Sequence, residues 1–147
     1  MKKVLILLLV VPIISLSQKT NKTNNYFSIG FLDHKTGSSI IGYSRTILQN
    51  ENNELFIGIG TMLSVNTISV GLKKYLVQRQ IKCYSVLSAQ SIYGMGGNFN
   101  APSFSFGLET RLIKKLFVNA GVNSIVRLYD EETKFITFPT LNINLRY

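Results

Sequence analysis

The only histidine of this 147-residue chain, His34, stands in a short polar segment that also holds Ser38 and Ser39. A histidine that takes the proton of a serine hydroxyl would activate that oxygen for attack on an ester, for example in a lipid. Geometry rather than proximity in sequence makes such a site, and the sequence places no acidic partner beside the histidine. We therefore interpret His34 as an exposed loop residue and predict no catalytic residue.

Two further patterns suggest ligand binding, but each lacks a necessary part. The acidic run 130–132 could hold a divalent cation, but Ca²⁺ and Mg²⁺ would need oxygen ligands from elsewhere in the chain. The run 94–97, Gly-Met-Gly-Gly, resembles a phosphate-binding loop, but it precedes no helix that could supply backbone amides. Cys83 is the only cysteine, which excludes an internal disulfide and a cysteine-based metal site. We expect no cofactor and no metal.

The elements that would position these residues are strands. The chain divides into eight apolar-rich pieces separated by turn signals, and no helical periodicity of any length competes with them. Several pieces alternate strictly between apolar and polar residues, which indicates a strand whose two faces meet different media. We predict strands over residues 26–32, 39–48, 55–63, 67–75, 81–93, 103–113, 116–128 and 135–147.

The number and length of these strands indicate a membrane barrel. Each piece is close to the ~9–11 residues that a tilted transmembrane strand needs, and an even count places both ends of the chain on one side. The predicted fold is an all-β, eight-stranded antiparallel up-and-down transmembrane β-barrel. The connections predicted to face outward are 33–38, 63–66, 93–102 and 129–134.

The face opposite the apolar one separates a membrane barrel from a soluble one. A soluble exterior is rich in Lys, Glu and Asp, whereas here that face carries mainly Ser, Thr, Asn and Gly, such as Gly58 and Gly107. Glycine would weaken the strands of a soluble barrel for no gain, but small residues fit the crowded interior of a narrow one. We therefore expect Phe104, Phe106, Leu141 and Ile143 to face lipid. A soluble exported barrel that binds an apolar ligand in its centre is an alternative.

The polar residues of the inner face should fill the barrel. An eight-stranded barrel is just wide enough for side chains, so we predict a plugged lumen rather than a polar pore. An unpaired buried charge is costly, so Glu109 should pair with Arg111, Arg45 or Lys73. The predicted lumen network consists of Arg45, Lys73, Glu109, Arg111, Asn119, Asn123, Asn142 and Asn144.

Residues 1–17 have the parts of a secretory signal peptide. Lys2 and Lys3 precede an apolar stretch, and residues 15–17 form a small-x-small cleavage site. The apolar stretch is shorter than the ~20 residues of a spanning helix, so cleavage is favoured over an uncleaved anchor. We predict a flexible lead-in over residues 18–25 and the barrel over residues 26–147.

The charge and the aromatic residues suit this arrangement. Lys and Arg number 16 against 7 Asp and Glu, a formal charge of +9, but the basic residues are scattered and form no basic helix. A nucleic-acid partner is therefore not expected. The 7 tyrosines fall mostly near predicted strand ends, where the aromatic girdles of membrane proteins lie.

Residues 106–122, residues 71–76 and the terminal aromatic Tyr147 together resemble the small outer-membrane β-barrel superfamily of Gram-negative bacteria. The resemblance implies export to the outer membrane with periplasmic chaperones as partners. It also implies insertion by the barrel-assembly machinery, which reads the last strand with Tyr147 as its assembly signal. It implies no particular activity.

The sequence thus favours a non-enzymatic outer-membrane protein with a structural or surface-interaction role. Its expected surroundings are outer-membrane lipids, and its expected state is a monomer. An outer-membrane lipid-modifying enzyme that uses His34 remains the alternative from another functional class.

Overall fold

A computed structural model describes residues 24–94, 97–128 and 133–147 of the chain. The predicted signal peptide and all but the end of the predicted lead-in therefore lie outside the described residues, as does the acidic run 130–132. Within the described part, no helix is long and apolar enough to cross a membrane.

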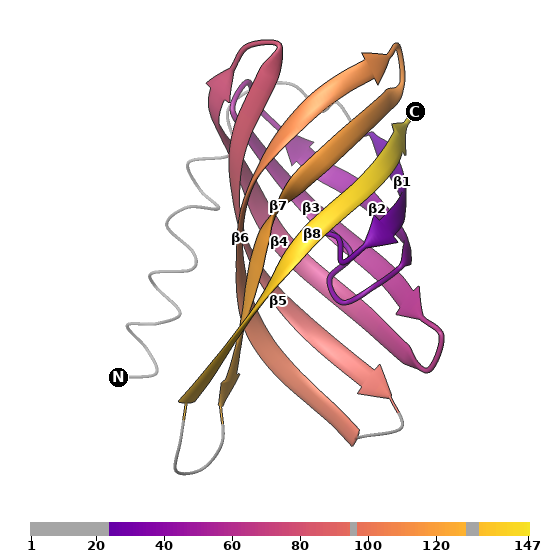
Figure 1. The fold of residues 1–147 in the computed structure, drawn as a ribbon, viewed down its shortest axis with the longest axis vertical. Helices are drawn as coiled ribbons and strands as arrows, with labels where there is room; N and C mark the ends of the chain where they lie inside the picture. Colours follow the sequence, from indigo (N-terminus) through magenta and orange to yellow (C-terminus); the bar gives the residue numbers. More distant parts are fainter. Residues whose placement is uncertain (1–23, 95–96, 129–132) are drawn as a thin grey trace.

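Eight antiparallel strands form a closed barrel in which each strand pairs with the next and β8 pairs with β1 (Figure 1). The up-and-down topology places Asn25 beside Tyr147, and the two residues exchange backbone hydrogen bonds of 2.8 and 3.1 Å. The strands are β1 (Asn25–Phe31), β2 (Ile41–Gln49), β3 (Asn53–Met62), β4 (Val65–Gln78), β5 (Ile81–Gly94), β6 (Gly97–Ile113), β7 (Leu116–Leu128) and β8 (Thr133–Arg146).

The barrel has the predicted inversion of its two faces. Phe104 and Leu141 point outward and are 50% and 60% exposed, whereas Gly107 and Asn142 are buried inside. Phe106 and Ile143 also point outward. Because lipid wets the outside of a membrane barrel, this apolar exterior is stable in a bilayer and would be costly in water.

Most strand boundaries lie within three residues of the sequence prediction, but the start of β6 differs more. β6 begins at Gly97 rather than at residue 103, so most of the predicted loop 93–102 is strand, and only residues 95–96 lie outside the described part. Asn and Pro in that run indicated a loop, but Asn98, Asn100 and Pro102 occupy outward positions of β6. β4 likewise begins at Val65, so the predicted outward connection 63–66 is a tight turn.

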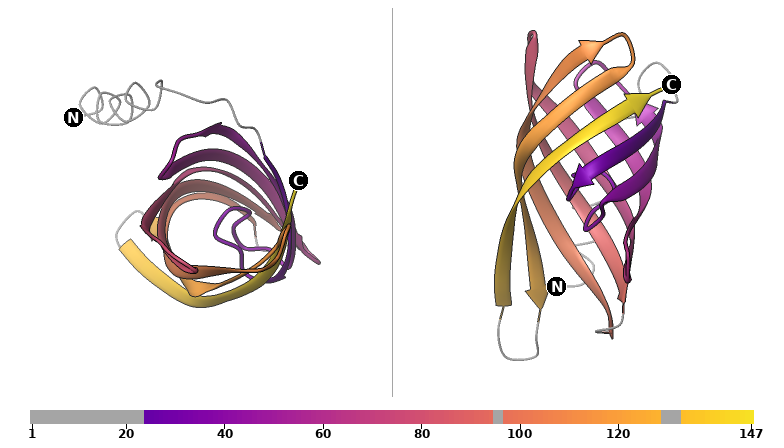
Figure 2. Two further views of the ribbon diagram at one scale, coloured as in Figure 1. Left: turned by 90° about the horizontal axis from the view of Figure 1, so that it is seen from above. Right: turned by 45° about the vertical axis from the view of Figure 1, so that its right-hand side comes forward.

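The largest difference is the connection between β1 and β2. Residues 32–39, hereafter the lumenal loop, fold into the barrel instead of projecting from it, as the view along the barrel shows (Figure 2). Seven of these eight residues are buried, and Ser38 is half-buried. The chain turns inward at Leu32, whose φ is 52°, and closes a small turn in which the Gly37 N–H donates to the Asp33 carbonyl (2.7 Å).

Along most of the barrel, apolar residues face outward and polar residues face inward. In β5–β8 this pattern partly reverses toward the end of the barrel opposite the termini, hereafter the far end. There several outward positions are polar: Ser91 bonds to Asn100 (2.6 Å) and Ser124 to Thr137 (2.8 Å), although the outward face also carries the exposed aromatic residues Tyr93 and Phe135. Polar outward residues over an apolar interior are typical of a sheet in water, so we expect these strand ends to extend beyond the lipid. The apolar interior residues at this end are Ile92, Ala101 and Ile125, with Val65, Phe99 and Phe138 packed against them.

At the far end, β8 extends past its neighbour β1. The β1–β8 pairing stops at Leu141, but β8 continues to Thr133 and pairs with β7 throughout. Residues 135–139 therefore have no ladder partner on one side among the described residues. Pro139 lies in this edge at a position whose main chain points to the open side, and proline has no N–H to leave unpaired.

Candidate functional site

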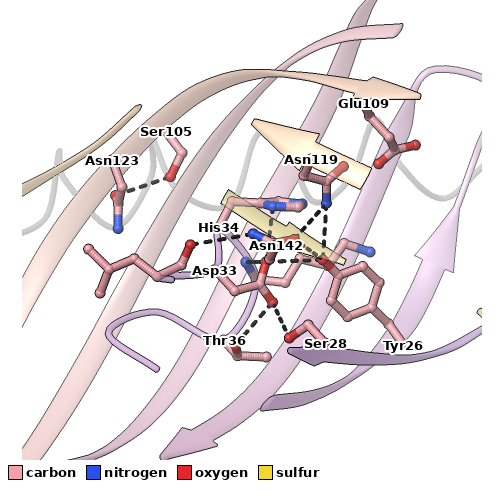
Figure 3. Close-up of polar contacts among 12 residues, drawn as sticks. Tyr26, Ser28, Asp33, His34, Thr36, Ser105, Glu109, Asn119, Asn123 and Asn142 are labelled. Carbon is pink, nitrogen blue, oxygen red and sulfur yellow. Dashed lines mark hydrogen bonds and ion pairs between the residues drawn. The ribbon is translucent and has the colours of Figure 1, made fainter. Parts of the chain in front are cut away.

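The lumenal loop is tied to the barrel wall through Asp33 (Figure 3). Its carboxylate accepts hydrogen bonds from the hydroxyls of Tyr26 (3.0 Å), Ser28 (2.8 Å) and Thr36 (3.0 Å). Tyr26 and Ser28 lie on the inward face of β1, so the strand that leads into the loop also binds the acidic residue of the loop. A buried carboxylate needs such donors because it has left water.

Lys35 extends from the loop toward the end of the barrel that holds the termini. Its Nζ lies 2.5 Å from the carboxylate of Glu54 on β3, and both side chains are buried. The Tyr75 hydroxyl on β4 donates to the other Glu54 oxygen (2.9 Å). The Lys35 carbonyl accepts from Ser69 Oγ (2.5 Å), so the loop is bound through its main chain as well.

Glu109 on β6 is the centre of a second cluster. It pairs with Lys73 of β4 (2.6 Å) and with Arg146 of β8, and it accepts a hydrogen bond from Tyr75 (3.3 Å). Tyr75 thus joins this cluster to Glu54. Charge-assisted hydrogen bonds of this kind are stronger than neutral ones, which suits groups that are shielded from water.

His34 lies between the two clusters and is buried, so its prediction as an exposed loop residue is wrong. Its ring stacks on Tyr84 at 4.6 Å between centroids, its Nδ1 lies 3.1 Å from Asp33, and its Nε2 lies 3.1 Å from Lys73 Nζ. Neither Ser38 nor Ser39 bonds to this ring among the described contacts, since the Ser39 hydroxyl bonds to Thr36 (2.6 Å). The arrangement contains a histidine and an acid but no serine nucleophile.

The lumen charges balance. Among the described residues, the two clusters hold three carboxylates and three basic side chains, in addition to His34. This equality lets a densely charged interior exist without a net charge to desolvate. The carboxylates belong to Asp33, Glu54 and Glu109, and the cations to Lys35, Lys73 and Arg146.

Six of the eight predicted lumen residues lie in the barrel interior: Lys73, Glu109, Asn119, Asn123, Asn142 and Asn144. Asn119 donates to the Tyr26 hydroxyl (3.2 Å) and to Asn142 Oδ1 (3.1 Å), and Ser105 donates to Asn123 Oδ1 (3.1 Å) (Figure 3). Asn119 and Asn142 thus connect β7 and β8 to the Asp33 cluster through Tyr26.

The other two predicted lumen residues do not lie in the interior. Arg45 is exposed on the outer face of β2, because it shares the alternation of Ile41 and Tyr43 rather than that of Ser44. Arg111 shares the inward alternation of Glu109 but lies past it, at the rim, and is exposed. Neither forms an ion pair with Glu109.

Several interior residues were not predicted from the sequence. Tyr26, Tyr75 and Tyr84 are buried in the network and do not belong to an interface girdle. Glu54 lies just before the predicted strand 55–63, although it shares the inward alternation of Phe56 and Gly58 and could have been found by extending that pattern.

The space for the lumenal loop is provided by glycines of the wall. A Cβ on Gly58 of β3 would overlap the Lys35 carbonyl oxygen, and one on Gly42 of β2 would overlap the Thr36 side chain. Close backbone approach of this kind requires glycine. The glycines that identified the inner face therefore also fix where the loop lies.

Comparison with known proteins supports the fold. No model of a known protein family matches the chain, and no curated protein matches it in sequence. Among solved structures, the N-terminal β-barrel domain of Pseudomonas aeruginosa OprF superposes with a TM-score of 0.51 at 14% identity, over 85% of this chain and 95% of that one. The fold is that of an eight-stranded outer-membrane β-barrel.

Two further outer-membrane barrels are similar to this one at lower scores. Neisserial surface protein A has a TM-score of 0.40 at 12% identity, over 84% of this chain and 92% of its own. Ail, the attachment invasion locus protein of Yersinia pestis, has 0.38 at 9%, over 85% and 95%. The apolar exterior of the closed barrel suits a protein that spans a membrane.

Proposed function

We propose that this outer-membrane barrel is a sealed, non-enzymatic protein with a structural or surface-interaction role. The observation that carries the proposal is the lumenal loop, whose Asp33 and Lys35 complete the charge network of the interior. A lumen closed by satisfied ion pairs leaves no continuous aqueous path for solutes. The protein acts as a monomer among outer-membrane lipids. Periplasmic chaperones deliver it, and the barrel-assembly machinery inserts it after recognising the final strand with Tyr147.

Conductance tests the seal directly. We expect the purified barrel to give no steady channels in planar bilayers. A variant in which residues 33–37 are replaced by Asn-Gly, a two-residue hairpin turn that needs no support from the lumen, should give steady channels. Steady conductance of the unmodified protein would reject the sealed lumen.

The far end of β5–β8 supports a surface role. Its polar exterior and apolar interior indicate that these strand ends stand in water outside the lipid, on the side opposite the termini. With the termini in the periplasm, this is the cell surface. The exposed edge of β8 and the exposed Leu63 in the β3–β4 turn belong to this region.

The two alternatives fit the structure less well. A soluble barrel with an apolar centre is contradicted by the charged interior and the apolar exterior. The lipid-modifying enzyme requires His34 to activate a nucleophile, but His34 is buried and contacts Tyr84, Asp33 and Lys73. We expect His34→Ala cells to keep an unchanged outer-membrane lipid profile by mass spectrometry, and the loss of a modified lipid species would favour the enzyme.

A further inference from the structure

The end of the barrel that holds the termini contains a cavity of about 490 Å³, hereafter the vestibule. Its lining comes from the β4–β5 turn, β5, β6 and the start of β7. The volume lies in the range of small-molecule sites, and it is far larger than the ~30 Å³ that one water molecule occupies. Its charged and aromatic lining residues are Arg79, Lys82, Glu109, Arg111 and Phe117.

The vestibule is strongly cationic. Three basic side chains line it against the single carboxylate of Glu109, which is already paired with Lys73 and Arg146 deeper in the lumen. Among the described residues, Arg79 and Arg111 form no ion pair. The positive charge of the vestibule is therefore not neutralised by the protein itself.

The inner wall of the vestibule is built from strand residues and aromatic rings. The Arg146 guanidinium stacks on the Phe117 ring at 4.3 Å, and Lys82 Nζ lies 5.2 Å from the centre of the Tyr75 ring. Lys82 is also paired across the β5–β6 ladder with Glu109, and Arg111 with Phe117. Strands rather than loops thus fix two of the three cations, which favours a preformed site.

We propose that the vestibule binds a phosphate group from the periplasmic side. Arginine forks match phosphate oxygens in two-point hydrogen bonds, and two unpaired arginines flank the cavity. The phosphate belongs either to a phospholipid head group or to a free phosphorylated molecule. Exposed Ile81, Leu112 and Ile113 lie on the neighbouring outer wall, where acyl chains would run in the first case.

A matched pair of probes distinguishes the two sources. Dihexanoyl phosphatidic acid and glycerol 3-phosphate carry the same phosphate monoester and differ in their acyl chains. Each is titrated calorimetrically into the purified full-length barrel in a non-ionic detergent. Tighter binding of the lipid identifies a head group as the ligand, and equal binding identifies a free phosphate ester; either result supports the site.

Two double variants test the residues. Arg79→Gln with Arg111→Gln should weaken binding of the probe at least about tenfold, because two bidentate partners are removed. Lys114→Gln with Lys115→Gln removes the same charge from the adjacent β6–β7 turn, outside the cavity, and should change the affinity less than about twofold. All four side chains are exposed, so both variants should keep the heat-modifiable gel mobility of a folded barrel.

The proposal is overturned if neither probe binds at millimolar concentration. It is also overturned if the two double variants weaken binding equally, because the interaction would then be a general attraction to a basic surface. The sealed-lumen function does not depend on this result, since Arg79 and Arg111 take no part in the ion pairs of Glu109. A failure of phosphate binding would leave the conductance prediction unchanged.

Discussion

At the scale of single residues, Glu109 is the lumen carboxylate that pairs with two basic side chains. It is fully buried and pairs with Lys73 and Arg146, while Tyr75 donates to it. Buried ion pairs of this kind add little net stability when complete, because desolvation offsets the attraction. Removing one partner is different, since it leaves the opposite charges buried and uncompensated.

Glu109→Gln should therefore destabilise the barrel by about 3–5 kcal/mol, because Lys73 and Arg146 would face each other without a carboxylate. Urea unfolding in lipid, followed by circular dichroism, measures this. Glu51→Gln removes an exposed acid and should change the stability by no more than about 0.5 kcal/mol. If the two changes lower the free energy of unfolding equally, the ion pairs of Glu109 contribute no more to stability than an exposed acid does.

At the scale of elements, the lumenal loop and the glycine-lined wall form one unit. Gly58 approaches the Lys35 main chain so closely that no side chain fits between them. The loop keeps its place through Asp33 and Lys35, so a bulky residue at position 58 must either push the loop out or strain the wall.

Gly58→Val should lower the unfolding free energy by at least about 1–3 kcal/mol, the usual cost of overpacking. It should also produce conducting events in planar bilayers when the loop is displaced. Ala120→Val adds volume on the lipid-facing side of β7 and should do neither. If the valine at position 58 is as harmless as the one at position 120, the loop does not lie against β3.

The unpaired edge of β8 can be detected by the hydrogen exchange of its backbone amides. Backbone amides of Phe135 and Thr137 point to the side that β1 does not cover, whereas those of Ile143 and Leu145 point to β1. Hydrogen exchange should therefore be faster at the first pair by orders of magnitude, because unpaired amides lack protection. Equal protection in the purified monomer would mean that another segment pairs with this edge.

The strands themselves were largely predictable, because lipid outside and small side chains inside impose a period of two that survives in the sequence. Phe104 and Leu141 followed that rule, and so did Lys73 and Asn142. The direction of the lumenal loop was not predictable from its own residues. Asp33 to Gly37 indicates a polar turn wherever it points, and its inward course depends on Gly42 and Gly58, which lie on other strands.

Two other predictions were wrong, each for its own reason. Arg45 was misplaced because its own charge was weighed above the alternation of its strand. The loop predicted over 93–102 failed because polar outward residues indicate either a loop or a strand that has left the lipid. Local sequence does not separate these two cases, since the second depends on how far neighbouring strands extend.

At the scale of the whole molecule, the barrel has three zones along its axis. A basic vestibule lies at the end that holds the termini, a lipid-facing band surrounds the charged lumen, and the far end of β5–β8 has the polarity of a soluble sheet. If the termini lie in the periplasm, as proposed, this order of zones predicts that the far end lies outside the cell.

The central claim is that apolar side chains face lipid while the charged set fills the lumen. The chain has no tryptophan, so single-tryptophan variants report on one position each. In bilayers with lipids brominated on their acyl chains, Phe106→Trp on the outer face should be strongly quenched and Phe56→Trp in the lumen should not. Strong quenching of the tryptophan at position 56 with little at position 106 would contradict the account.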